Sequence, residues 1–150
     1  MDTAPIITRL RGQVTALKIV GGAAEVEAAL NGLAAAPAAF VIEQTDTAKE
    51  NEIANEVHQR VEVGLLVLLA VKNAKDSRGE AGQGDLETLR GIVASGPPPA
   101  GSVAAALIGW QPAASIDPLT YSGGQLFRFD PGIIWWLEAY RTAHYIRSAA

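Results

Sequence analysis

Apolar residues occupy alternate positions along residues 57–72, the most regular pattern in the chain. The odd positions from Val61 to Val71 are all apolar, whereas the even positions are polar or glycine up to Gly64 and apolar from Leu66 to Ala70. A period of two predicts a β-strand, here with one half-exposed end and one end covered on both faces. At about 3.3 Å per residue it would extend about 50 Å, so we expect it to project from the domain within a long hairpin or arm.

The first 37 residues predict a helix, a short strand and a second helix. Thr3 suits a helix start, and apolar residues recur every four positions across about residues 4–14. A brief apolar run at 17–20 predicts a strand that ends at a Gly-Gly pair. Helical spacing then resumes until Pro37, which breaks the second helix.

Residues 38–42 predict a short strand, and the polar segment 45–56 that follows is expected to be a solvated loop or arm. The segment is acidic, because only Lys49 opposes its carboxylates. These are Asp46, Glu50, Glu52 and Glu56. Two interpretations stay open here: a contact surface for a basic partner, or charge that serves only solvation.

Glycine and charge dominate residues 73–84, beyond the long strand, and Asp85 is expected to cap the helix that follows. Residues 95–101, with three consecutive prolines, interrupt that helix. Ser102 is expected to restart a short helix that stops at Gly109.

The C-terminal third is rich in strand patterns. Residues 119–121 and 125–129 flank Ser-Gly-Gly at 122–124, a plausible hairpin turn, and 133–146 predict a long terminal strand. The order of elements predicts an α+β fold with a mixed, mostly antiparallel sheet, helices packed on one face, and a projecting long hairpin or arm.

Length and composition predict one ordinary folded domain spanning residues 1–150. The chain is 49% apolar and 19% charged, with a formal net charge of −4. The acidic balance argues against direct nucleic-acid recognition, and the longest apolar stretch is too short to span a bilayer. The absence of cysteine excludes thiolate metal sites and cysteine nucleophiles.

Motifs for catalysis or cofactor binding are weak throughout the chain. The glycines of 79–84 lack the lysine and hydroxyl residue of a phosphate-binding loop, and His58 and His144 lie outside metal-ligand spacings. No catalytic residue, cofactor or metal is therefore expected. An alternative from another class is a small ligand-binding or hydrolytic domain with a cleft near His144 and Tyr140.

Trp135 and Trp136 are adjacent in the predicted terminal strand, so their indoles must face opposite sides of the sheet. One of them must cover a helix, another edge or another subunit. A core with a covering helix and a subunit interface explain the pair equally well.

The chain as a whole resembles the tail terminator proteins of long-tailed bacteriophages, including those of Mu-like prophages and, distantly, the lambda type. The resemblance rests on the order and spacing of several segments across residues 5–146. They are Pro37–Gln44, Gln59–Asn73, Gly109–Pro112, Leu119–Leu126 and Ile134–Trp136.

This resemblance implies a structural virion protein rather than an enzyme. Such proteins form a ring, typically a hexamer, on the end of the tail tube, stop its growth and provide the head-joining surface. The implied partners are copies of the chain itself, the tail tube protein and a head-completion or connector protein. The implied location is the head-proximal end of the virion tail, with assembly in the host cytoplasm.

We expect the polar half of the long strand, the acidic segment before it and one tryptophan to contact neighbouring subunits or the tube. The residues concerned are Glu50, Glu52, His58, Arg60, Glu62 and Trp136. A head-completion or neck protein of the same particle is the second interpretation, because it would share the small size and the lack of catalytic motifs.

Overall fold

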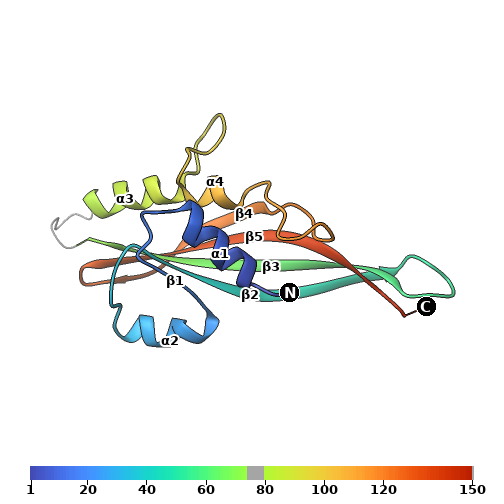
Figure 1. The fold of residues 1–150 in the computed structure, drawn as a ribbon. Helices are drawn as coiled ribbons and strands as arrows, with labels where there is room; N and C mark the ends of the chain where they lie inside the picture. Colours follow the sequence, from blue (N-terminus) through green and yellow to red (C-terminus); the bar gives the residue numbers. More distant parts are fainter. Residues whose placement is uncertain (74–79, 150) are drawn as a thin grey trace.

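The computed structural model describes residues 1–73 and 80–149, and within them the fold is a five-stranded open sheet with helices on both faces (Figure 1). The strand order is β1-β2-β3-β5-β4. In chain order the strands are β1 (Ile19–Gly22), β2 (Ala38–Asn51), β3 (His58–Lys72), β4 (Thr120–Asp130) and β5 (Ile133–Arg147). Only the β1–β2 pair is parallel. The expected α+β fold with a mixed, mostly antiparallel sheet is confirmed.

The helices divide between the two faces of the sheet, which differs from the expectation that all lie on one face. They are α1 (Ala4–Gln13), α2 (Ala23–Asn31), α3 (Glu80–Arg90) and α4 (Val103–Leu107). The main core packs α1, α3 and α4 against the odd positions of β3, whereas α2 packs with Phe40, Leu68 and Trp135 on the other face. The reason is that the second half of β3 is apolar on both faces, so each face needs a cover.

The long strand predicted at 57–72 is confirmed as β3, which pairs along its whole length with β5. Its partner β2 is longer than the predicted 38–42, because the strand continues through the polar residues up to Asn51. Of the two forms expected for the segment that begins at 45, a loop or an arm, the structure shows an arm, and the expected projecting hairpin is confirmed. Backbone hydrogen bonds to β3 hold these residues extended, and their side chains remain exposed. We call residues 45–64 the arm; Figure 1 shows it extending beyond all the helices.

Two further expectations about element boundaries were wrong. Asp85 lies inside α3, which begins at Glu80, so it is not a cap; part of the expected loop at 73–84 lies outside the described residues. Residues 122–124 lie within β4 and make no hairpin turn. The chain reverses instead at Pro131 and Gly132, the latter with φ of +80°.

Two other local predictions are confirmed. Ser102 caps α4, and its Oγ accepts a hydrogen bond from the Ala105 amide at 3.2 Å. The terminal strand runs from Ile133 to Arg147, close to the predicted 133–146. In the first half of this strand, alternate side chains enter the two cores, because helices cover both faces of the sheet there.

Candidate assembly surfaces

The turn at the end of the arm, residues 51–57, is held by the side chain of Asn51. Its Nδ2 donates to the carbonyl oxygen of Glu56 at 2.7 Å, and its Oδ1 accepts from the backbone amide of His58 at 2.7 Å. An asparagine that bonds to the backbone in this way replaces the ladder hydrogen bonds missing in the turn. The tip therefore has a fixed shape although its side chains are exposed.

Two of the predicted contact residues, Glu52 and His58, meet at the arm together with Tyr145 of β5. The His58 and Tyr145 rings stack with centroids 4.5 Å apart. Glu52 Oε2 lies 3.0 Å from His58 Nδ1, and the Tyr145 hydroxyl donates to Glu52 Oε1 at 3.2 Å. The cluster ties the tip of the arm to the neighbouring strand β5.

The other charged residues predicted on β3 also have partners within the chain. Arg60 donates to Asp117 Oδ2 at 2.8 Å, and this hydrogen bond raises the pKa of Arg60 above its ordinary value. Glu62 lies 3.6 Å from Lys49 across the hairpin. Glu50 is exposed on the outer strand of the arm. Five of the six predicted residues therefore lie on the arm.

Trp136, the sixth predicted residue, lies away from the arm and packs in its own chain. Its ring is half-buried against the main core, with the guanidinium of Arg90 4.4 Å from the ring centroid. Trp135 enters the opposite core, and its Nε1 donates to Asp130 at 3.1 Å. The structure shows a covering helix for the pair, because Arg90 of α3 lies over Trp136; a subunit contact at the exposed part of Trp136 stays a prediction.

A buried polar cluster joins α3 to the sheet, and the sequence analysis missed it. Arg90 Nε donates to Oε1 of the fully buried Glu138 at 3.1 Å, and its NH2 donates to the Tyr121 hydroxyl at 3.1 Å. Burial by itself lowers the pKa of Arg90, but the hydrogen bonds and charges of Glu138 and Tyr121 together raise that pKa overall. The one sequence signal was a glutamate within an otherwise apolar stretch of the terminal strand.

Tyr140 is buried beside this cluster, and its hydroxyl has no hydrogen-bond partner among the described residues. Burial, followed by the charge of Glu138, raises the pKa of Tyr140 above its ordinary value of 10.0. Above pH 10 the unfolded chain therefore loses this proton while the folded chain keeps it. Stability is retained below that pH and falls as the pH rises further.

We expect Tyr140→Phe to leave the free energy of unfolding unchanged at pH 7, or to raise it by up to about 1 kcal/mol, because no hydrogen bond is lost. The variant should also lose less stability than the wild type between about pH 9.5 and 11. Urea denaturation of the wild type and the variant at about pH 7, 9.5 and 11 measures the free energy of unfolding. A loss above about 1 kcal/mol at pH 7 would show that the hydroxyl has a partner.

The edge strand β4 exposes an apolar patch made of Leu126, Phe127 and Phe129. No further strand pairs with its outer edge among residues 1–73 and 80–149. The register shifts twice along β4, after Tyr121 and after Leu126. Such irregularities hinder the addition of another strand, so side chains rather than backbone are available for contact.

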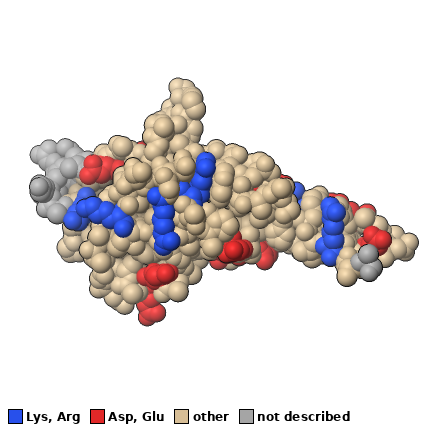
Figure 2. All heavy atoms as spheres, viewed as in Figure 1, with Lys and Arg blue, Asp and Glu red and all other residues tan. Residues whose placement is uncertain are grey.

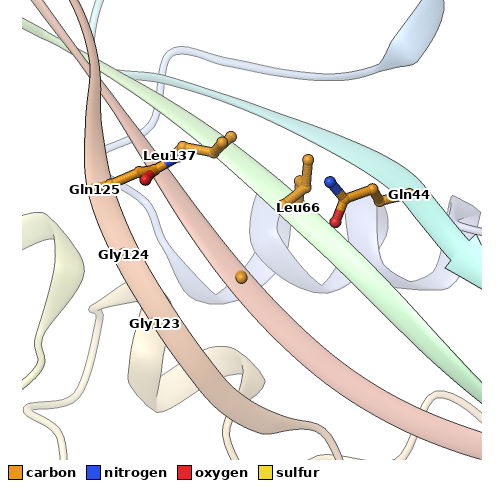
Figure 3. A pocket seen from close by; sticks show the side chains of 7 residues that line it. Gln44, Leu66, Gly123, Gly124, Gln125 and Leu137 are labelled. Atoms are coloured by element: carbon orange, nitrogen blue, oxygen red, sulfur yellow. The ribbon is translucent and has the colours of Figure 1, made fainter.

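A trough of about 400 Å³ lies on the same face of the sheet as α2, in the part that α2 does not cover (Figure 3). Leu66 and Leu137 form its apolar part, and Gln44 and Gln125 flank it from β2 and β4. A smaller hollow of about 180 Å³ lies near Arg60 on the arm. Neither His144 nor Tyr140 lines the trough or the hollow, so neither cavity is the cleft that the hydrolytic alternative requires.

Surface charge is distributed unevenly over the molecule. Figure 2 shows Lys and Arg side chains on the body around α1, and acidic side chains next to basic ones along the arm.

Within the described residues, no helix has the length and apolar character needed to cross a membrane. Across the same part of the chain, His, Asp and Glu side chains form no group of three or more suited to a metal ion.

Comparison with known proteins identifies the family of this chain. A search of curated protein sequences returned no match. The family model described as phage tail terminator protein matches residues 1–150, which is the entire chain. The chain belongs to the phage tail terminator protein family.

Proposed function

We propose that this protein assembles as a ring of copies, typically a hexamer in such proteins, on the head-proximal end of the tail tube. There it stops tube growth and provides the surface that the head joins. The family match over the whole chain is the observation that carries this proposal. The proposed role is structural, it requires no cofactor, and its site of assembly is the host cytoplasm.

The open sheet is compatible with self-association around a ring. The two edges of the sheet differ. At one edge β4 exposes apolar side chains, and at the other edge the short strand β1 pairs with residues 38–41 of β2. Contact between two different surfaces of neighbouring copies repeats head to tail, and it closes into a ring when the rotation allows. Once the ring occupies the last binding surface of the tube, its opposite face accepts no further tube subunit.

We propose the arm as the element that contacts neighbouring subunits or the tube. Its contact residues would include Glu50, Glu52, His58, Arg60 and Glu62, which lie on it. The last four form pairs within the chain, and these pairs hold their side chains at fixed positions. Trp136 is left out of the proposed surface because it packs beneath Arg90.

Deleting the gene in the phage or prophage that carries it is expected to produce tails that are overlong and lack heads. Electron microscopy of the lysate measures tail length, and expression of the intact gene from a plasmid should restore normal particles. Tails of normal length beside unstable filled heads would contradict the proposal and favour the neck protein instead.

A further inference from the structure

The tip of the arm carries an apolar surface that the fold of its own chain does not use. Ile53, Val57 and the neighbouring Ile146 are between 41% and 44% exposed. The charges around them are acidic on balance: residues 49–58 contain one lysine and three glutamates, and Arg147 of β5 lies opposite His58, which gives a net charge of −1 with His58 neutral. Exposed apolar side chains with a charged rim are typical of a protein contact surface.

The segment that holds α1 has the opposite charge. Side chains of residues 1–22 comprise three basic groups, Arg9, Arg11 and Lys18, against Asp2, which gives a net charge of +2. The Arg9 Nε donates to the carbonyl of Ala106 at 3.0 Å, and Arg11 NH2 donates to that of Val20 at 2.8 Å. These bonds fix the two guanidinium groups in position without neutralising them.

The basic groups of this segment are available for a partner. No carboxylate in the described part of the chain lies within 4.0 Å of Arg9, Arg11 or Lys18. Trp110 is half-buried beneath Arg9, with 5.2 Å between the guanidinium carbon and the ring centroid, and offers apolar surface beside the charges. This basic face, defined by Arg9, Arg11, Lys18 and Trp110, therefore complements the tip in both charge and apolar character.

We propose that the tip of one copy docks on the basic face of the next copy. This inference rests on the proposed ring and names the contact that builds it. The tip lies beyond the helices of its own chain, so the contact is made between copies (Figure 1). A tip and a face are different surfaces, so the contact repeats head to tail from copy to copy.

Charge reversal on either side tests the proposal. One variant, Glu50→Lys/Glu56→Lys, reverses the charge of two acidic residues of the tip that have no described partners. A second variant, Arg11→Glu/Lys18→Glu, reverses the charge of two residues of the basic face. Each variant should assemble at least about tenfold less than the wild type, because like charges then meet at every contact. The four-fold variant restores opposite charges and should recover assembly. Native mass spectrometry and sedimentation velocity measure the assembled fraction, on free protein and on isolated tails.

A control variant, Glu27→Lys/Asp85→Lys, makes the same change in net charge on exposed positions of α2 and α3 and should assemble like the wild type. Circular dichroism confirms that each variant is folded. Loss of assembly without recovery in the four-fold variant would overturn the pairing of tip and face. Variants that assemble normally but no longer cap tubes would assign the tip to the tube and overturn the proposal as well.

Cross-linking provides an independent readout, because the chain has no cysteine of its own. Copies carrying Ala54→Cys at the tip, mixed with copies carrying Lys18→Cys, should form a disulfide-linked dimer of the two variants. As a control, Ala28→Cys, an exposed position of α2 on the opposite face of the sheet, replaces Lys18→Cys and should cross-link at least about tenfold less. Wild-type protein that neither assembles nor shortens tubes would refute the proposed function itself, whereas rings without this cross-link would refute only the contact.

Discussion

Replacement of Arg90 by leucine is expected to lower the free energy of unfolding by about 3–5 kcal/mol. The substitution leaves the carboxylate of Glu138 fully buried without its cationic partner. It also removes the hydrogen bond from Arg90 to Tyr121 and the contact with the Trp136 ring. Urea denaturation at pH 7, followed by tryptophan fluorescence and circular dichroism, measures the loss.

The double variant Arg90→Leu/Glu138→Leu distinguishes a lost ion pair from lost packing. With both charges replaced by apolar groups, most of the stability should return. Lys49→Ala, at an exposed pair 3.6 Å from Glu62, serves as a control and should cost less than about 1 kcal/mol. A single-variant loss of similar size to this control would show that water already screens the carboxylate.

Gly91→Ala is expected to lower the free energy of unfolding by about 2–5 kcal/mol, the sum of backbone strain and overpacking. Gly91 follows α3 with φ of +71°, and a Cβ there would overlap Ser102 Oγ. Ser102 is 3% exposed and donates to the Pro99 carbonyl at 2.7 Å, so a shift of its side chain would break this buried hydrogen bond. Displacing it would also remove the cap of α4.

Gly96→Ala isolates the backbone contribution in the same loop. Gly96 has φ of +91°, but a Cβ there would meet nothing within 4 Å. Its substitution should therefore cost only about 1–2 kcal/mol. Thermal and urea denaturation of both variants give the comparison, and equal losses would show that Ser102 accommodates the added methyl group.

Both effects concern how α3 and α4 attach to the sheet, and they affect assembly only through stability. The arm, residues 45–64, is formed by β2, β3 and the turn between them and contains neither Arg90 nor Gly91. Folded populations of these variants should therefore still display the tip. This separates variants that unfold the protein from charge variants that alter contacts between copies.

Strands with a covered face were predictable from the sequence, and polar strands were not. The alternation in β3 places six apolar residues on one face, and burial of that face fixes strand type and register. Residues 45–51 of β2 have no such face, because both sides are exposed in the arm. Their extended form depends on pairing with residues 59–64, which no local pattern reveals.

The position of α2 and the course of β4 show the same limit. Spacing of apolar residues predicted that α2 forms, but its choice of face depends on where the other helices pack. Ser-Gly-Gly at 122–124 is typical of a turn, yet Glu138, Trp136 and Tyr121 pack against Gly124 within a continuous strand. The sequence alone does not distinguish a glycine required for close packing from a glycine required for a turn.

The sequence by itself determined the fold class, the two long strands, the cap of α4 and, through the resemblance, the family. These depend on local periodicity and on the order of segments, which the chain carries in linear form. Only the tertiary structure decided that Tyr145 of β5 joins Glu52 and His58 at the tip, that Trp110 lies beneath Arg9, and that Trp136 packs half-buried beneath Arg90. Such groupings arise from residues distant in sequence, and burial and hydrogen bonding bring them together only in the folded chain.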